Sequence, residues 1–212
     1  MYILGLNAYH GDSSACIFKD NKLVAAIEEE RIRRIKHWAG FPSESIKFCL
    51  GECDISIQDV DHITISRDPS ANIYKKITHS IKHAVSLKVL KDRFKNTRKV
   101  NSVKQELSNV FSINEAEIKA EVHNIEHHRS HMASAFFASP FEDSAILSID
   151  GFGDFTSTMI GIGRDKKIEV LDSVVYPHSV GVFYTAFTQY LGFEHYGDEY
   201  KVMGLSPYGK PT

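Results

Sequence analysis

The sequence has few cysteines, no long apolar run and little net charge. Its three cysteines, Cys16, Cys49 and Cys53, form an odd set that favours reduced thiols in a cytoplasm over a disulfide framework. No run approaches the roughly 18 apolar residues of a membrane span, and residues 1–7 lack the basic and long apolar segments of a signal peptide. The net charge of −2 provides no overall field for nucleic acid or an anionic membrane. We therefore expect a cytoplasmic protein that binds neither.

The composition that is present is that of a globular protein. The chain has 212 residues, of which 42% are hydrophobic and 25% charged, enough to bury a sizeable core. Residues 208–212 form a turn-rich ending without a closing element. We expect one domain over 1–212 that is incomplete at its C-terminus, and a homodimer is left open. Cys49 and Cys53 lie one helical turn apart, as half of a metal site would, but no second cysteine pair completes it.

Apolar stretches predict strands in two groups that resemble each other. The first group lies at 2–6, 14–18 and 23–29, where Asp20-Asn21 supplies a tight turn. The second group, at 144–150, 155–162 and 168–175, repeats the order of strand, polar loop, strand, turn and strand. Two such meanders with helices between them are how sugar kinases, actin and heat-shock ATPases are built. We predict an α/β fold with a mixed sheet, of the actin-like ATPase or ribonuclease H-like type, containing the first repeat and part of the second. Further elements are predicted as strands at 61–66 and 120–125 and helices at 43–51, 128–138 and 180–191.

A basic segment separates the two groups. Between Lys75 and Lys104 there are ten Lys or Arg residues and one acid, Asp92. Such a stretch could contact phosphates or an acidic partner. The favoured interpretation is a solvated helical insert over about 73–107, whose apolar residues pack on the domain. Those residues are Ile77, Ile81, Val85 and Leu87.

Two early loops have the composition of anion-binding or proton-transfer sites. In the loop at 7–14, the hydroxyls of Ser13 and Ser14 and the backbone could hold an oxyanion, while His10 could move a proton beside Asp12. A polar hairpin in which these groups satisfy the turn explains the same residues equally well. Lys36 lies beside an aromatic residue in the turn after an acidic-to-basic run at 28–37, and there it could hold a phosphate. By itself, that run is better explained as solvated charge.

The strongest local motif is a histidine pair. On a helix, His127 and His131 are separated by one turn and project from the same face, so both imidazoles can bind one metal. His128 points elsewhere. A single helical histidine is usually structural, but a spaced pair that opens a helix rich in small residues favours metal binding. Two ligands are too few for a catalytic cation, which usually needs a third from the protein.

Asp150 is the best candidate for the third ligand. It ends a buried strand directly before a flexible turn that contains Gly151 and Gly153. The carboxylate could equally hold a nucleotide-bound metal or a phosphate-bridging water. Leaving it buried and unpaired would be costly, so a cation or donor is expected nearby.

A last polar segment lies at 197–205. Lys201, followed by Gly204, could contact a phosphate, while Asp198 or Glu199 could contact a substrate amine or hydroxyl. An exposed loop with paired charges is the alternative.

Together these motifs resemble the carbamoyltransferases of nodulation-factor and antibiotic biosynthesis, including the aminoglycoside and cephamycin enzymes. The resemblance spans residues 4–209 and is carried by Leu4–Asn7, His10–Ser14, Glu28–Arg31, Lys36-His37, the His127 and His131 pair, Asp150–Gly153 and Lys201–Leu205.

The resemblance implies a two-part enzyme. In such enzymes, a C-terminal domain makes carbamoyl adenylate from carbamoyl phosphate and ATP. The actin-like N-terminal domain then passes the carbamoyl group to a hydroxyl of a sugar or secondary metabolite. It further implies that His127 and His131 bind a divalent metal, with iron first and zinc second, and that magnesium accompanies the nucleotide. Asp150 would lie near the adenylate, Lys36 would contact an anion and His10 would assist transfer.

This sequence departs from the family in two respects. Gly11 stands between His10 and Asp12, where the family often has histidine directly before aspartate. The last metal-binding aspartate and the adenylate-forming domain would lie beyond residue 212, so we expect this chain to be inactive alone. The expected mechanism has the metal polarise the carbamoyl carbonyl while a base in the loop takes the hydroxyl proton and AMP leaves.

Two other functional classes are compatible with the fold. An actin-like sugar kinase or ATPase would use Asp12 and Asp150 around magnesium, but magnesium prefers oxygen ligands and the histidine pair suits iron or zinc. A non-catalytic relative would keep the fold without the chemistry.

Overall fold

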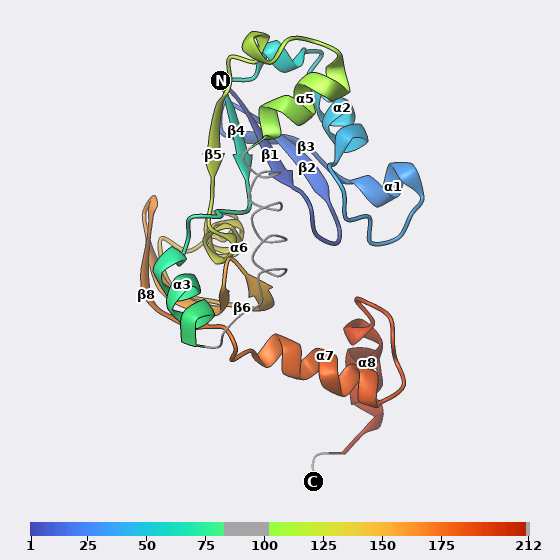
Figure 1. Cartoon of the computed structure of the whole chain (residues 1–212), viewed down its shortest axis with the longest axis vertical. Helices are drawn as coiled ribbons and strands as arrows, with labels where there is room; N and C mark the ends of the chain where they lie inside the picture. Colours follow the sequence, from blue (N-terminus) through green and yellow to red (C-terminus); the bar gives the residue numbers. More distant parts are fainter. Residues whose placement is uncertain (83–101, 211–212) are drawn as a thin grey trace. The chain divides into compact units, whose positions relative to one another are not determined.

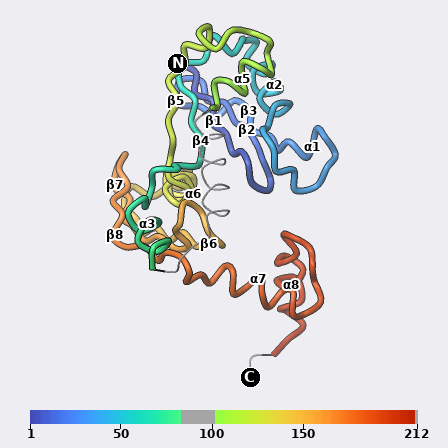
Figure 2. Tube along the Cα trace, viewed as in Figure 1, coloured from blue at the N-terminus to red at the C-terminus, as the bar shows by residue number. Residues whose placement is uncertain are grey.

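The computed structural model describes residues 1–82 and 102–210 and divides the chain into two compact units, Met1–His127 and His128–Thr212. Figure 1 shows the order of the elements, and Figure 2 follows the chain through both units. Among the described residues, no helix is both long and apolar enough to cross a membrane.

The first unit is built on a five-stranded mixed sheet. Its strands are β1 (Tyr2–Asn7), β2 (Ser14–Lys19), β3 (Lys22–Glu28), β4 (His62–Ile65) and β5 (Glu121–Asn124), in the order β3-β2-β1-β4-β5. β1, β2 and β3 form the predicted antiparallel meander, whereas β4 and β5 continue the sheet in parallel. Asp20 and Asn21 both have positive φ, at 48° and 65°, as the favoured two-residue hairpin turn requires. The predicted turn is therefore confirmed.

Helices cover one face of this sheet (Figure 1). They include α2 (Ser43–Glu52) and α5 (Val103–Phe111), accompanied by α1 (Glu29–Arg33), α3 (Ile73–Lys82) and short 3-10 turns at Ile57–Asp59 and Glu115–Glu117. Alternate strand residues such as Leu4, Ile17 and Ile63 meet the buried face of α2 and α5 in one apolar core. Cys49 lies fully within this core, where burial raises the pKa of its thiol to about 12.

Part of the predicted basic insert lies outside the described residues. Residues 83–101 belong to that part, which includes Val85 and Leu87, and the extent of the insert stays a prediction. α3 confirms helical structure at the beginning of the segment. Ile77 and Ile81, which were expected to pack on the domain, are instead mostly exposed on α3, because no described element buries that face.

The second unit contains the second predicted meander. β6 (Asp143–Gly153), β7 (Thr156–Arg164) and β8 (Lys167–Val175) pair in antiparallel order. α6 (His127–Phe136) begins at the last residue of the first unit and packs Met132 and Phe136 against this sheet. α7 (Val180–Tyr190), α8 (Glu199–Leu205) and a 3-10 turn at Ser206–Tyr208 follow. The predicted α/β class, with a mixed sheet and a repeated meander, is confirmed.

Two glycines let α6 approach the sheet closely. A Cβ at Gly161 would lie 2.4 Å from Met132 Cε and 2.5 Å from the backbone oxygen of Glu169. A Cβ at Gly163 would meet the ring of Phe136 at 2.6 Å. β7 therefore needs glycine at the positions beneath the helix.

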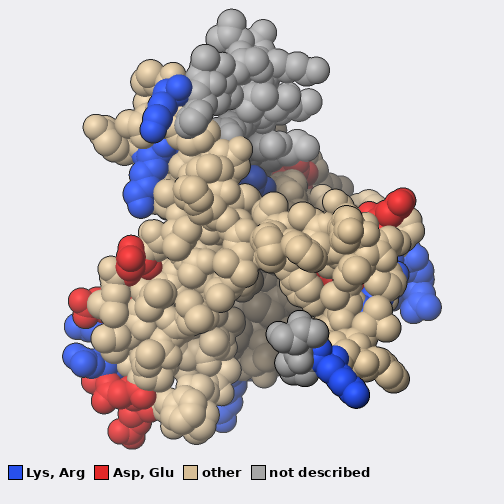
Figure 3. Space-filling model, turned by 90° about the horizontal axis from the view of Figure 1, so that it is seen from below, with Lys and Arg blue, Asp and Glu red and all other residues tan. Residues whose placement is uncertain are grey.

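The surface carries no dominant charge on the face shown in Figure 3. Acidic and basic side chains stand there in small, separate groups within a mostly uncharged surface. This distribution agrees with the near-neutral composition of the chain.

Candidate metal and transfer site

The two histidines of the predicted metal site open α6. His127 is the first residue of the helix, and His131 follows one turn later on the same face. His127 Nδ1 lies 3.4 Å from the backbone oxygen of Ser66, directly after β4. The end of a sheet strand therefore positions the start of the helix.

Asp150 completes a group of three ligands. Its Oδ2 lies 3.6 Å from Nε2 of His131, and both side chains are about half exposed. One ligand atom from each of His127, His131 and Asp150 lies within 4.8 Å of the other two. Two imidazole nitrogens and one carboxylate oxygen suit iron or zinc better than magnesium, so the donor set fits the predicted metal. Its role as a metal site stays a prediction.

The turn that carries Asp150 is held by the start of α7. Asp150 Oδ1 accepts a hydrogen bond of 2.6 Å from the Gly151 amide. Ser179, the N-cap of α7, directs its hydroxyl at the backbone oxygens of Asp150 and Gly151, at 3.1 and 2.7 Å. A Cβ on Gly181 would lie 2.5 Å from the Asp150 carbonyl, so only glycine lets the helix start this close. These contacts fix the position of the carboxylate.

Gly151 and Gly153 serve the backbone in this turn. A Cβ on Gly151 would meet nothing within 4 Å, and Gly153 pairs with Thr156 across a register shift in β6. The shift bends the strand end, as β-bulges commonly do near functional sites. Their predicted contact with a cofactor stays a prediction.

His128 is a positioning residue that sequence analysis did not select. It is fully buried, with Nδ1 2.8 Å from the Ser148 hydroxyl and Nε2 3.0 Å from the Thr156 carbonyl oxygen. A carbonyl can only accept, so Nε2 carries the proton and Nδ1 accepts from Ser148. This fixed tautomer joins α6 to β6 and β7 and sets the rotation at which His131 faces Asp150.

The loop after β1 uses much of its polarity internally. The Ser13 hydroxyl is buried, 2.8 Å from the Gly40 oxygen and 3.1 Å from that of His10. Ser14 begins β2, opposite Asn7. Asp12 has a φ of 61°, and its carbonyl accepts from the Asn7 amide group. Binding of nucleotide or adenylate by Ser13 and Ser14 stays a prediction.

His10 lies beside the first metal ligand. Its ring meets that of His127 edge-on, with the centroids 5.7 Å apart. His10 Nδ1 lies 3.2 Å from the Gly11 oxygen, so the neutral ring donates from Nδ1 and has its lone pair on Nε2. The loop histidine and the start of α6 therefore come together within the first unit.

A second polar group lies on the other side of the same loop. Asp12 Oδ1 and His37 Nδ1 are 2.8 Å apart, and Glu30 Oε2 accepts a 2.9 Å bond from the His37 amide. These three residues also have the composition of a cation site. Lys36 is exposed in the adjacent turn, and its contact with an anion stays a prediction. Glu30 and His37 stood in the charge run, but nothing in its composition distinguished them.

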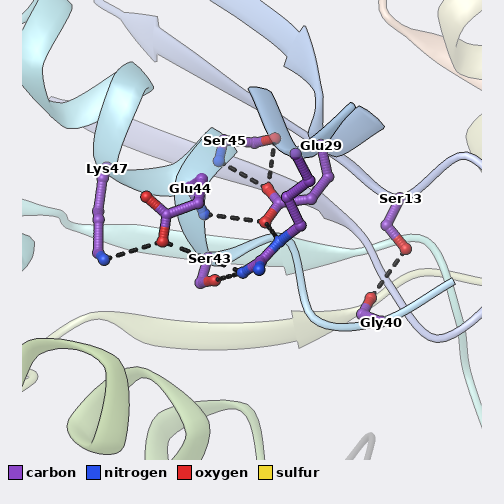
Figure 4. Close-up of polar contacts among 8 residues, drawn as sticks. Ser13, Glu29, Gly40, Ser43, Glu44, Ser45 and Lys47 are labelled. Carbon is purple, nitrogen blue, oxygen red and sulfur yellow. Dashed lines mark hydrogen bonds and ion pairs between the residues drawn. The ribbon is translucent and has the colours of Figure 1, made fainter. Parts of the chain in front are cut away.

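The charge run at 28–37 is anchored by a buried carboxylate (Figure 4). Glu29 accepts bonds from the Ser45 amide and hydroxyl, at 2.7 and 2.8 Å, and from the Glu44 amide at 3.1 Å. Arg33 adds a bond of 2.6 Å from Nε, and its guanidinium stacks over Trp38, 4.6 Å from the ring centroid. The cation beside the aromatic ring is thus Arg33.

The same bonds control the ionisation of Glu29. Burial by itself raises the pKa of a carboxyl group, but the bonds from Ser45, Arg33 and Glu44 outweigh that penalty. The pKa of Glu29 is therefore lowered, and the carboxylate joins α1 to the start of α2. This junction fixes the turn that carries Lys36 and His37.

Lys201 and Gly204 lie on α8. Lys201 Nζ is 2.5 Å from Asp198 Oδ1, and this bond is the main cause that raises the pKa of Lys201 and lowers that of Asp198. Glu199 accepts a 2.6 Å bond from Thr185 on α7. In the described part of the chain, none of these partners is a predicted metal ligand. The paired-charge alternative explains these contacts, and binding of a cofactor by Lys201 and Gly204 stays a prediction.

Comparison with known sequences places this geometry in a family context. The family described as the carbamoyltransferase N-terminus matches residues 2–212. Protein sll1178 of Synechocystis is 37% identical over 99% of this chain and 35% of its own length. Nodulation protein NolNO of Sinorhizobium fredii is 33% identical over 97% of this chain and 29% of its own. The chain spans about a third of the length of these curated relatives.

Solved structures overlap with this chain at low sequence identity. YeaZ from Pseudomonas aeruginosa has a TM-score of 0.43 and 13% identity, over 83% of this chain and 67% of that one. The Aquifex aeolicus PPX-GPPA enzyme has a TM-score of 0.40 and 14% identity, over 100% and 65%.

Proposed function

This chain belongs to the carbamoyltransferase family, whose N-terminal part it matches, and on that premise we propose that it carries the site of carbamoyl transfer. The observation that supports this proposal best is the grouping of His127, His131 and Asp150, with His10 against His127. A transfer site needs a cation near the carbonyl and a base near the acceptor, and these residues provide candidates for both.

The finer reaction is part of the proposal. The donor is carbamoyl phosphate, converted with ATP to carbamoyl adenylate by an adenylate-forming part of the protein. The acceptor is a hydroxyl of a sugar or secondary metabolite. In the transfer step, the acceptor oxygen forms a bond to the carbamoyl carbon, the bond from that carbon to the AMP phosphate oxygen breaks, and the hydroxyl proton passes to a base.

The metal would be held by His127, His131 and Asp150. When bound, a divalent ion at these ligands polarises the carbamoyl carbonyl and stabilises negative charge on its oxygen. His128 and Ser179 keep two of the ligands in place through the buried bonds to β6 and the clamp on the Asp150 turn. Fixed ligands favour tight binding, since loss of such supporting bonds commonly weakens metal affinity about 10–100-fold.

His10 is the candidate base. With Nδ1 donating to the Gly11 oxygen, its Nε2 lone pair accepts the acceptor's hydroxyl proton. Asp12 supports the loop from its far side by pairing with His37. Lys36 is placed in the next turn to attract the phosphate of the adenylate.

Metal content and transfer activity test the proposal together. The chain is purified and supplied with an adenylate-forming part of the enzyme, carbamoyl phosphate, ATP and a panel of sugar hydroxyl acceptors. We expect iron or zinc in the wild type. The His127→Ala, His131→Ala double variant should lose that metal and more than about a hundredfold in transfer rate.

An exposed histidine gives the matched control. His178→Ala changes a histidine outside the ligand group and should keep both metal and rate. Magnesium alone in the wild type, with phosphoryl transfer from ATP to the sugar, would favour the kinase alternative. Unchanged product formation by the double variant would favour a structural role for the pair.

A further inference from the structure

A second group of metal-binding side chains lies on the first sheet, and it shares no residue with the transfer site. His62 is on β4, and Glu121 and His123 are on β5. In the parallel register His62 pairs with Glu121 and Thr64 with His123, so all three side chains stand on one face. Ile63 and Ile65 point to the core from the opposite face. The pairing of two strands thus gathers residues 61 positions apart.

The three ligand atoms have the spacing of a zinc site. Nδ1 of His62 lies 3.0 Å from Nε2 of His123, and Oε2 of Glu121 lies 3.9 and 3.8 Å from these nitrogens. A circle through these three atoms has a radius of about 2.1 Å, and Zn–N and Zn–O bonds in proteins have this length. One ion can therefore contact all three atoms without any movement of the backbone.

A hydrogen bond alone explains only part of this arrangement. Two neutral imidazoles 3.0 Å apart can share one N–H···N bond. That bond leaves the Glu121 oxygen beyond hydrogen-bond distance of both rings, although it points at the same place. A cation accounts for all three positions, because two nitrogens and an oxygen can converge on it.

We propose that His62, Glu121 and His123 form a second divalent metal site, of the class that takes zinc. The donor set excludes magnesium as the preferred ion, since magnesium favours oxygen ligands alone. Each histidine side chain is 36% exposed and that of Glu121 is 71% exposed, which leaves room for water as a fourth ligand. The bound ion connects β5 to β4 and stabilises the outer strand. This inference does not depend on the proposed function.

Zinc stoichiometry tests the second site directly. The metal-free chain is titrated with zinc in competition with a chromophoric chelator. We expect two tight equivalents in the wild type and one fewer in the His62→Gln, His123→Gln variant. Glu121→Gln, at an exposed position that does not affect folding, should weaken the second equivalent about tenfold or more.

Two further variants separate this site from the transfer site. His127→Ala, His131→Ala should remove the other equivalent, and His178→Gln should remove none. A loss only in the His62 and His123 variant would support this inference while the proposed function failed. Zinc should also raise the Tm of the wild type and of the His127 and His131 variant by a few degrees, but not that of the His62 and His123 variant. Unchanged zinc affinity and stoichiometry in the His62 and His123 variant would overturn the inference and leave a histidine hydrogen bond only.

Discussion

The two meanders of this protein share one plan but differ in what supports them. β1, β2 and β3 belong to a core of 16 buried hydrophobic residues that continues into β4 and two helices. β6, β7 and β8 share a core of four, and their opposite face leaves Leu147, Ile149 and Ile160 exposed. The first meander can therefore tolerate a buried charge beside its core. The second depends on close backbone packing beneath a single helix.

The polar anchors follow the same division. In the first unit, Glu29 is an ionised group with several donors around it. In the second, His128 needs one donor and one acceptor. An ionised anchor makes stability sensitive to the loss of a single partner and to acid, whereas close packing makes it sensitive to added volume. Three predictions test this contrast.

The largest effect is expected at Glu29. Glu29→Ala leaves the Arg33 guanidinium and the Ser45 and Glu44 amides without their buried acceptor, and removing one partner from such a network costs about 3–5 kcal/mol. Urea unfolding at neutral pH measures the loss. Glu52→Ala, on the exposed end of α2, is the matched control and should stay within about 0.5 kcal/mol of the wild type. A loss of less than about 1 kcal/mol for Glu29→Ala would show that the carboxylate is not an anchor.

A smaller effect is expected from added volume beneath α6. The Cβ of Gly161→Ala would meet the Glu169 backbone, which cannot move as a side chain can, and such overpacking costs about 1–3 kcal/mol. Thermal unfolding compares it with Gly204→Ala, which adds the same atom to α8 where nothing lies within 4 Å. The control should be neutral or stabilise the helix by up to about 1 kcal/mol. Equal Tm values for both variants would contradict close packing at β7.

The smallest effect is a change with acid. The folded pKa of Glu29 lies below the unfolded value, so its stabilisation is complete above about pH 4.5 and is lost as the pH falls through the folded pKa. The stability difference between wild type and Glu29→Gln should therefore be constant above pH 5 and shrink below pH 4.5. Urea unfolding over this range measures it, with Glu52→Gln as a variant that should show no such trend. A difference that stays constant down to pH 3 would contradict the lowered pKa.

Local periodicity predicted most of the fold and part of the candidate site. The alternation of apolar residues around Leu4 and Ile17 gave the strands, and positive-φ residues marked the first hairpin. The one-turn spacing placed His127 and His131 on one helical face, and Asp150 was selected because it follows a buried strand. These features depend on neighbours within a few residues, so sequence alone contains them.

Contacts between distant residues could not be predicted in this way. The partners of His128 lie 20 and 28 residues away, so its fixed tautomer depends on how α6 packs. Glu29 has the composition of a solvated charge run, and only the position of α2 shows that it is buried. His62 and His123 meet because β4 and β5 pair in parallel, a register that neither segment specifies alone.

The outer strand β5 also affects how two molecules of this protein meet. A sheet edge is a template for pairing with another chain, and aggregation often begins there. β5 is only four residues long, and Glu121 and Asn124 are exposed on it. When two copies approach edge to edge, their Glu121 carboxylates repel each other, and this repulsion opposes strand addition. A proton or a metal ion on Glu121 cancels this repulsion, so acid and excess zinc should both lower the colloidal stability of the protein.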